Sequence, residues 1–224
     1  MLNTSLTANL QYYMANLPWM GSHVSIDAFE PLKLGIDSEV YRFTVSYDEG
    51  GERQSHTFAL KVYQDTTDGK DRALKERHAL HHLRVVHYAV PGVLVVEIDP
   101  EHLGRPFIIM EYVESQTMLE HIAAAQGDSE TLDALALLFA ELFAALHQHD
   151  YKLLVPRMAE PSTYALINRE IHTMRGLIRD YGQAELTPLL DWLYAQRATV
   201  TAPQISVTHR DFHPSNVLIT ADGL

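Results

Sequence analysis

His209-Arg210-Asp211-Phe212-His213-Pro214-Ser215-Asn216 is the stretch of this sequence that decides its fold. It places a carboxylate, Asp211, and a side-chain amide, Asn216, five residues apart on one polar segment. A carboxylate can accept or orient the proton of an attacking hydroxyl, and an amide oxygen can help to hold Mg²⁺ on phosphates. Asp211 and Asn216 are therefore candidate functional residues, as a possible proton acceptor and a possible metal ligand.

Short strands are predicted on both sides of this loop, over residues 205–208 and 216–220. Ala221-Asp222-Gly223 then has the composition of a hairpin turn. A hairpin turn without a return strand leaves the backbone groups of an apolar strand unpaired. We therefore expect the native protein to continue past Leu224, so that this sequence is a fragment of a longer chain.

The segment between residue 114 and the loop is predicted to be helical. Residues 128–148 show the strongest helical periodicity, and Asp128 or Ser129 is the expected N-cap. Further helices are expected over residues 162–181 and 185–198, with Pro188 in the first turn of the last, where proline is tolerated. The apolar face of the 128–148 helix is formed by Leu132, Leu135, Leu138, Phe139, Leu142, Phe143 and Leu146.

The first half of the chain is predicted to be rich in strands. Residues 40–47 and 57–63 alternate β-branched or aromatic residues with others, and a glycine-containing turn separates them, as in an antiparallel hairpin. Two more strands are predicted over residues 93–98 and 106–113. Helices are expected at the N-terminus, over residues 6–17, and between the second and third of these strands, over residues 70–86.

The composition of the chain limits its partners. Its 224 residues are 46% hydrophobic, which is ample for a core, and its net charge of -12 argues against nucleic acid or an anionic membrane as the main partner. The absence of cysteine excludes disulfides and thiolate metal sites and suits a cytoplasmic protein. No N-terminal signal peptide and no membrane span is predicted.

Lys61 is a candidate functional residue because it interrupts an apolar strand, Phe58-Ala59-Leu60-Lys61-Val62. A buried ammonium group needs a partner. Glu76, fifteen residues later on the next predicted helix, is a suitable one. In kinase folds such a lysine contacts the α- and β-phosphates of the nucleotide and is held by a glutamate. The alternative is that both are solvated surface residues, which Asp211 and Asn216 make less favourable.

Two further segments are candidates for nucleotide contacts. The apolar strand 106–113 could be any core strand, but in kinase folds the strand at this place is the hinge, where the backbone carbonyl near Glu111 and the amide near Val113 would meet the adenine edge. In the loop before the first hairpin strand, Gly35 can allow close approach of phosphates and Ser38 can add a donor. An ordinary turn is an equal alternative for that loop, because one glycine is a weak signal.

Metal sites built on histidine are competing interpretations. His209 and Asp211 could open a site for iron made of two histidines and one carboxylate, but His213 is too near to be the distal ligand. That interpretation also leaves Lys61, Glu76 and Asn216 without a role. His78 and His82 are four residues apart on a predicted helix, a spacing that can bind metal, but a solvated helix face is favoured.

The segment His-Arg-Asp-Phe-His-Pro-Ser-Asn-Val-Leu resembles the aminoglycoside phosphotransferase family, which shares its protein-kinase-like fold with choline kinases. That family usually shows His-Gly-Asp-Leu-His-Pro-Gly-Asn-Val-Leu at this place. The resemblance extends over most of the chain, from the first helix through the strand-rich lobe with Lys61 and Glu76 to the loop. It implies a two-lobed α+β fold, with a nucleotide-binding lobe over residues 1–113 and an incomplete helical lobe over residues 114–224.

The resemblance also implies an activity and a set of roles. The expected reaction is transfer of a phosphoryl group from ATP, with Mg²⁺, to a hydroxyl of a small molecule whose identity it leaves open. Asp211 would be the catalytic base and Asn216 a Mg²⁺ ligand. Lys61 and Glu76 would position phosphates. The contributions of Gly35, Ser38, Glu111 and Val113 to nucleotide binding follow the same pattern.

Departures from the family pattern keep two other functions open. Arg210 stands where the family has glycine, as in protein kinases, whereas His213-Pro214 opposes a protein kinase. The second Mg²⁺ ligand of the family, an aspartate about a dozen residues after Asn216, would fall beyond Leu224. A non-catalytic nucleotide-binding or interaction module is therefore the other alternative. The oligomeric state is left open as well.

Overall fold

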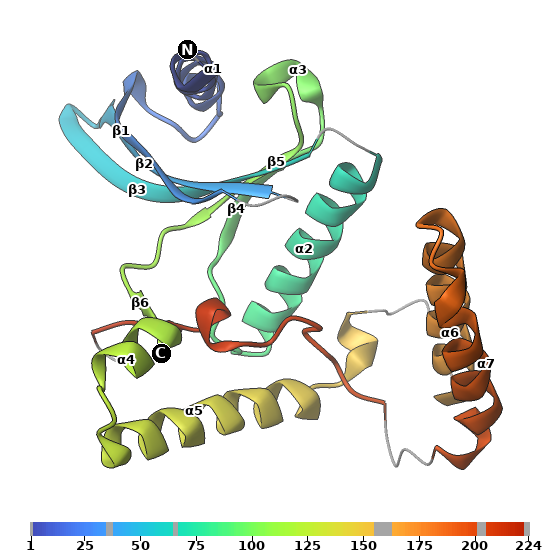
Figure 1. Ribbon diagram of the computed structural model, residues 1–224. Coiled ribbons are helices and arrows are strands. Elements are labelled where there is room, and N and C mark those ends of the chain that lie inside the picture. Colours follow the sequence, from blue (N-terminus) through green and yellow to red (C-terminus); the bar gives the residue numbers. More distant parts are fainter. Residues whose placement is uncertain (1, 35–37, 65–66, 155–162, 201–204, 222–224) are drawn as a thin grey trace. The chain divides into compact units, whose positions relative to one another are not determined.

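The computed structural model describes residues 2–34, 38–64, 67–154, 163–200 and 205–221, and its contacts divide the chain into two compact units (Figure 1). The first, here called the sheet unit, comprises Met1–Glu141 and Asp211–Leu224. The second, the helical unit, comprises Leu142–Arg210. The sheet unit thus contains the strand-rich half of the chain together with the Asp211 loop. The lobe boundary at residue 113 stays a prediction.

An antiparallel sheet of five strands, in the order β1-β2-β3-β5-β4, forms the centre of the sheet unit. The predicted hairpin is confirmed, and both of its strands are longer than predicted. The two later strands are also present, and the second of them inserts between the hairpin and the first. The strands are β1 (Ser22–Leu34), β2 (Ser38–Glu49), β3 (Glu52–Tyr63), β4 (Val93–Glu97) and β5 (Phe107–Glu111).

Five helices belong to the sheet unit or extend from it, and they confirm the helices predicted near the N-terminus, after the hairpin and from residue 128. Of two short helices, α3 was not predicted, and α4 lies in the segment after residue 114 that was predicted to be helical without separate bounds. Both start at a side-chain cap: Asp99 accepts from the Glu101 amide, and Thr117 and Glu120 form a capping box. The helices are α1 (Leu2–Ala15), α2 (Thr67–Val85), α3 (Pro100–Leu103), α4 (Met118–Ala124) and α5 (Ser129–Gln148).

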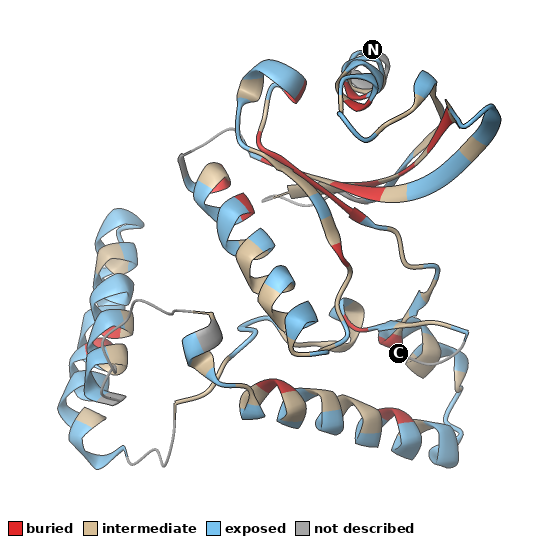
Figure 2. Cartoon of the chain, turned by 180° about the vertical axis from the view of Figure 1, so that it is seen from behind, coloured by how far each residue is buried: buried red, intermediate tan, exposed pale blue. Residues whose placement is uncertain are grey.

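The core of the sheet unit lies on both faces of the sheet, between α1 and α2 (Figure 1). Because successive residues of a strand point to opposite faces, Leu60 joins Leu10 of α1 in one buried cluster, whereas Ala59 and Tyr63 join Ala73 of α2 in the other. Figure 2 shows buried residues along the middle strands. Lys61 has the same parity as Tyr63, and this places it on the α2 face.

A two-residue turn joins β2 to β3. Gly50 and Gly51 have φ angles of 62° and 88°, and their neighbours Glu49 and Glu52 are the last pair of the ladder. Positive φ at both central residues is what the tightest hairpin turns require, and glycine adopts it without a steric penalty. This turn fixes the register of β2 against β3 and therefore places Lys61 opposite Val40.

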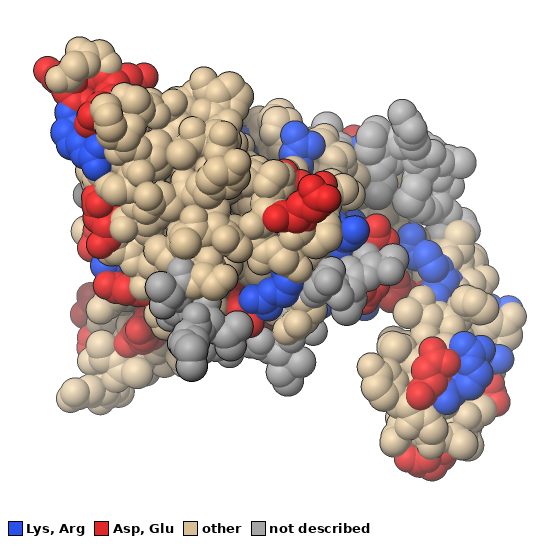
Figure 3. All heavy atoms as spheres, turned by 90° about the horizontal axis from the view of Figure 1, so that it is seen from above, with Lys and Arg blue, Asp and Glu red and all other residues tan. Residues whose placement is uncertain are grey.

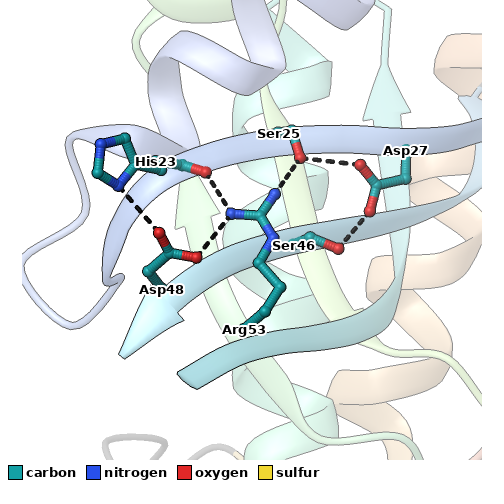
Figure 4. Close-up of polar contacts among 6 residues, drawn as sticks. All are labelled: His23, Ser25, Asp27, Ser46, Asp48 and Arg53. Atoms are coloured by element: carbon teal, nitrogen blue, oxygen red, sulfur yellow. Dashed lines mark hydrogen bonds and ion pairs between the residues drawn. The ribbon is translucent and has the colours of Figure 1, made fainter. Parts of the chain in front are cut away.

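A polar network holds the start of β1, an edge strand, onto the hairpin (Figure 4). Arg53 donates to the backbone carbonyl of His23 at 2.8 Å, to Asp48 at 3.0 Å and to Ser25 at 2.7 Å. Asp27 extends the network, accepting from Ser25 and from Ser46. The ladder between β1 and β2 has three register shifts. Such irregularities make an edge strand a poor template for pairing with another chain.

Helix α1 packs on the sheet through an apolar and aromatic face. Leu10 and Met14 are fully buried, and the ring of Tyr13 makes edge contacts with Phe107 and His102 at centroid distances of 5.0 and 4.8 Å. The helix contains no Lys, Arg, Asp or Glu. The face seen in Figure 3 is largely uncharged over the sheet unit. Side-chain packing therefore attaches α1, together with a hydrogen bond from the Tyr13 hydroxyl to the Glu97 carboxylate at 3.4 Å.

The region around the Asp211 loop corrects two predictions. Residues 205–208 do not form a strand and have no ladder partner among the described residues. The strand predicted over residues 216–220 is reduced to β7 (Leu218–Ile219), which pairs with β6 (Gln116–Thr117). Its first residues are instead used by a 3-10 turn, η4 (Pro214–Asn216), in which the Asn216 amide donates to the carbonyl of His213.

Two helices make up most of the described part of the helical unit. They are α6 (Thr163–Asp180) and α7 (Thr187–Gln196). They confirm the two predicted helices, and Pro188 lies in the first turn of α7. Ile171 and Leu190 are their buried side chains, at 6% and 3% exposure. Three 3-10 turns accompany these helices: η1 (Tyr151–Leu153), η2 (Ala184–Leu186) and η3 (Arg197–Thr199).

Candidate active site

The predicted pairing of Lys61 with Glu76 is present in the sheet unit. Lys61 Nζ donates hydrogen bonds to both carboxylate oxygens of Glu76, at 2.8 Å to Oε1 and 2.6 Å to Oε2. The side chains are 23% and 30% exposed, respectively. A charge-assisted bond of this kind stabilises an ammonium group that is largely withdrawn from water. The remaining exposure leaves Lys61 accessible to an anion.

Tyr63 is a third member of this group that sequence analysis missed. Its hydroxyl donates to Glu76 Oε2 at 2.6 Å, and its ring lies 5.3 Å from Lys61 Nζ. Burial, followed by the negative charge of Glu76, raises the pKa of Tyr63 above its usual value of 10. The phenol is therefore a permanent donor. The one feature of the sequence that could have indicated Tyr63 is its position two residues after Lys61, because residues i and i+2 of a strand lie on the same face.

The loop proposed to cover phosphates is described only in part. Gly35 lies outside the described residues. Ser38 is the first residue of β2 and stands opposite Tyr63 in the ladder, two positions before Val40, the partner of Lys61. Cross-strand partners share a face of the sheet, so Ser38 lies on the α2 face with Lys61 and Tyr63.

Glu111, predicted to offer its backbone to a nucleotide, uses its side chain as a clamp at the end of β5. Arg84 of α2 binds its two carboxylate oxygens at 2.7 and 3.0 Å, and the Gly92 amide donates to it at 2.8 Å. Arg84 and then Gly92 lower the pKa of Glu111. A Cβ on Gly92 would lie 2.5 Å from Arg84 Nη1. A side chain at position 92 would therefore displace the paired groups of Arg84 and Glu111.

The backbone after β5 has one feature that suits its predicted role. The Val113 carbonyl accepts from the Ser115 hydroxyl at 3.0 Å. The Glu111 amide is already used, because it donates to the Gly92 carbonyl at 2.9 Å. Within residues 67–154, no acceptor is found for the Val113 amide. The contact of the Val113 amide with a nucleotide base stays a prediction.

The two predicted groups of the loop lie side by side. Asn216 Nδ2 donates to Asp211 Oδ2 and to the Asp211 backbone carbonyl, both at 3.0 Å. His213 accepts from the Ser215 amide through Nδ1, and its Nε2 lies 3.4 Å from Asp211 Oδ1. The Asp211 side chain is 73% exposed. It is thus oriented by neighbours on its own loop and still open to a substrate.

Two apolar anchors hold this loop to the rest of the sheet unit. The ring of Phe212 packs against Phe139 of α5 with a centroid distance of 4.7 Å. On the far side of the loop, Val217 is 6% exposed and its carbonyl accepts from the amide of Met118, the first residue of α4. Asp211 and Asn216 are thereby fixed between two packed residues, which limits their movement.

Arg210 has an unusual backbone conformation, with φ of 67°. This left-handed region suits glycine and is unfavourable for residues with a Cβ atom. The departure from His-Gly-Asp noted in the sequence thus has a structural counterpart. The guanidinium group gains only an exposed ion pair, at 3.6 Å from Glu170. The conformation is needed to turn the chain into Asp211.

The described residues contain neither a cluster of metal ligands nor a helix that could cross a membrane. In the parts of the chain that the structure covers, no three His, Asp or Glu side chains are arranged to hold a metal ion, and the described helices include none able to cross a bilayer. His78 and His82 lie close, with ring centroids 4.1 Å apart, and His82 Nδ1 is 2.8 Å from the His78 carbonyl.

A family model links this chain to known proteins. Residues 28–224 match the model of the phosphotransferase enzyme family. The matched segment includes every residue discussed above as part of the site. Among curated proteins, none matches the sequence.

Solved structures show the same kinase-like fold. A protein from Ralstonia eutropha JMP134, assigned by name to the aminoglycoside phosphotransferases, has 18% identity and a TM-score of 0.56, with 96% of this chain and 60% of that one covered. The GDP and kanamycin complex of APH(2″)-IIIa has 16% identity and a TM-score of 0.59, with 100% and 69% covered. The chain therefore spans less than two thirds of the length of the first of these proteins.

Proposed function

Because the chain belongs to the phosphotransferase enzyme family, we propose that it transfers a phosphoryl group from ATP to a hydroxyl group of a small molecule. The observation that carries this proposal is the pair of groups in the sheet unit: Lys61 held by Glu76, and Asp211 beside Asn216. Phosphoryl transfer needs positioned phosphates and a carboxylate next to the nucleophile, and little other chemistry from the protein.

The nucleotide would be bound by the α2 face of the sheet and the chain after β5. Lys61 is largely withdrawn from water and still open to an anion, so it is suited to contact the α- and β-phosphates. Gly35 and Ser38 would cover the phosphates from the start of β2. The Glu111 carbonyl and the Val113 amide would bind the adenine edge. Because the backbone would contact the adenine, the side chain of Glu111 can at the same time bind Arg84.

The chemical step assigned to this chain is a proton transfer at Asp211. As the acceptor oxygen forms its bond to the γ-phosphorus, the bond from that phosphorus to the β-phosphate oxygen breaks and ADP leaves. The proton of the acceptor hydroxyl passes to Asp211 Oδ1 or Oδ2. Its high exposure makes the carboxylate accessible to a substrate, and Asn216 and the packed Phe212 keep it in place.

The donor set of the loop fits magnesium. Mg²⁺ prefers hard oxygen ligands and is commonly held by one or two protein groups together with phosphate oxygens and water. Asn216 and Asp211 offer such oxygens on one loop. When bound, the ion would neutralise charge on the phosphates. The contribution of this chain is to present the Asn216 amide and to keep Asp211 beside it.

A small-molecule acceptor is favoured by the His213-Pro214 pair after the aspartate and by the kanamycin complex of the neighbour APH(2″)-IIIa. Fold similarity at such low identity does not transfer that substrate to this chain. The acceptor class is therefore proposed as hydroxyl compounds of metabolite size, such as sugars, amino sugars and amino alcohols.

A direct assay tests this function. The chain is incubated with Mg²⁺ and ATP labelled at the γ-phosphate, with a panel of sugars, amino sugars and amino alcohols, and labelled products are separated. We expect a product that requires one class of acceptor, Mg²⁺ and Asp211. Thermal unfolding with ATP, in Mg²⁺ and in EDTA, gives a second measure, because a ligand at 100 times its Kd adds about 2.7 kcal/mol of stability. No product with any acceptor and no ATP-dependent stabilisation would refute the proposal.

A further inference from the structure

We propose that Tyr63 is a positioning residue for nucleotide binding, whose hydroxyl fixes the Glu76 carboxylate so that Lys61 stays directed toward phosphates. This inference rests on the proposed function and adds a residue to it. Tyr63 touches neither the reacting atoms nor the phosphates in this assignment. It acts only through Glu76.

The geometry of the shared carboxylate oxygen is the first support. Glu76 Oε2 receives two short bonds, from Lys61 Nζ and from the Tyr63 hydroxyl, both at 2.6 Å. Oε1 receives Lys61 alone, at 2.8 Å. A carboxylate held only by a flexible lysine can rotate with it. A second donor that belongs to a rigid ring fixes the position of Oε2, and through it the direction of the ammonium group.

The rigidity of Tyr63 is the second support. Its backbone amide donates to the Pro106 carbonyl at 2.9 Å, which ties the end of β3 to the start of β5. Its ring is 1% exposed and packs in the cluster that contains Ala73 and Ile108. Ala73 precedes Glu76 by about one helical turn on α2. The ring and the carboxylate it bonds are therefore held between the same sheet and the same helix.

The chemistry of the hydroxyl is the third support. Because burial and the charge of Glu76 raise the pKa of Tyr63 above its usual value, the phenol keeps its proton at any pH suited to an assay. It can therefore only donate to the carboxylate. The ring also lies 5.3 Å from Lys61 Nζ, within the range in which an aromatic face attracts a cation.

The variant Tyr63→Phe tests the hydroxyl separately from the ring. The variant keeps the packing against Ala73 and the aromatic face near Lys61 but removes one of the two donors to Glu76 Oε2. We expect Lys61 to become less well directed. Affinity for ATP with Mg²⁺ should fall about 3- to 10-fold, the range for loss of one hydrogen bond. Affinity for adenosine, which has no phosphates, should not change.

Tyr41→Phe is a matched control within the same sheet. Tyr41 of β2 is 6% exposed and donates to a glutamate, Glu39 Oε2, at 2.8 Å. It belongs to the cluster on the α1 face, away from Lys61. Both variants lose a hydroxyl bonded to a carboxylate from a buried ring. A purely structural role would therefore affect the two variants alike, in thermal stability and in ligand binding.

The first measurement compares Kd for ATP with Mg²⁺ and for adenosine in the full chain, in Tyr63→Phe and in Tyr41→Phe. A loss of ATP affinity confined to Tyr63→Phe, with adenosine affinity unchanged, supports the proposal. Equal losses of ATP and adenosine affinity in Tyr63→Phe, or equal effects of the two variants, overturn it.

A second measurement needs no nucleotide. The rate of acetylation of Lys61 by acetic anhydride is measured by mass spectrometry in the same three proteins. Faster modification in Tyr63→Phe than in Tyr41→Phe and the parent chain supports the positioning role, and equal rates in the two variants overturn it. If the parent chain binds no ATP, the proposed function fails, whereas the acetylation rates still decide the role of Tyr63.

Discussion

The sheet unit and the helical unit bury their apolar residues to very different extents. In the sheet unit, strands β3 and β5 have buried side chains on both faces, under α1 on one side and α2 on the other. In the described part of the helical unit, the buried apolar side chains are Leu146, Ile171 and Leu190. Leu177, Leu189 and Trp192 are between 50% and 58% exposed.

This difference follows from the two kinds of secondary structure. A strand in the middle of a sheet is covered on both faces by whatever packs on that sheet, whereas a helix in a pair is covered along one stripe. All of the residues proposed to act on substrates, apart from Gly35, also lie in the described part of the sheet unit. The better-packed unit is thus the one proposed to carry the chemistry, in keeping with the rigid support that a site needs.

The largest expected effect tests this assignment of chemistry to the sheet unit. Asp211→Asn keeps the shape of the side chain but removes its ability to accept a proton, so turnover should fall about 10³-fold, within the range for general bases. Asp191→Asn is the control, since Asp191 of α7 is a carboxylate of the helical unit paired with Arg175 at 2.7 Å. Initial rates and Kd for ATP are measured for both. Comparable losses of turnover in the two variants would contradict the assignment of the chemistry to the sheet unit.

The next effect concerns core packing. Leu60 of β3 is fully buried, and Leu60→Ala should lower the free energy of unfolding by about 2 to 5 kcal/mol. Leu177→Ala removes the same atoms from a side chain that is 50% exposed, and should cost less than about 1 kcal/mol. Urea unfolding followed by tryptophan fluorescence and by circular dichroism gives both values. A larger loss for Leu177→Ala would show that the helical unit is covered in solution.

A third prediction concerns the acid stability of the sheet unit. Arg105 lowers the pKa of Glu39, and Arg84 lowers that of Glu111. A folded-state pKa below the unfolded value of 4.5 means that these bonds stabilise the fold above that pH and that the stabilisation is lost as pH falls through the folded pKa. Glu39→Gln should therefore be about 1 to 2 kcal/mol less stable than the parent chain at pH 7.

The difference between this variant and the parent chain should shrink as the pH falls through the lowered pKa of Glu39, because the parent chain then loses the ion pair that the variant lacks. Urea midpoints at several pH values between 7 and 3 measure the difference. The stability difference between Glu111→Gln and the parent chain should also decrease as the pH falls. A difference that stays constant over this range would contradict the stabilising role of the ion pair.

The smallest effect concerns Arg210, at the junction between the units. Arg210→Gly relieves a φ of 67° and should stabilise the chain by about 0.5 kcal/mol, after the extra freedom of glycine in the unfolded state is subtracted. Arg210→Ala is the control, because it removes the same guanidinium group and keeps the unfavourable φ. Melting temperatures of the two variants are compared. Equal values would mean that the conformation at residue 210 is not strained.

The sequence predicted the local elements of both units and their family, but not their packing. Lys61 and Glu76 were identifiable because a charge interrupts an apolar strand and a partner follows on a helix. Tyr63 was not, because the direction of its hydroxyl depends on how α2 packs on β3. The insertion of β5 between β3 and β4 is a long-range pairing that periodicity does not encode.

Two local predictions failed, or were incomplete, for related reasons. The apolar residues 205–208 have the composition of a strand but no ladder partner, and strand propensity without a partner does not make a strand. Pro214 starts a turn that shortens the strand after Asn216. Arg210 departs from the glycine of the family pattern, and this is visible in the sequence. Only the structure shows that the backbone of residue 210 has positive φ.

The turn at Gly50 and Gly51 has a practical use. A side chain added at either glycine would meet nothing within 4 Å, and the neighbouring Glu49 and Glu52 are exposed. Insertions are best tolerated at exposed loop tips of this kind. Because the two glycines also set the register of the hairpin, a fluorophore attached beside them, at Glu49 or Glu52, would report on the protein from outside its core and leave the turn intact.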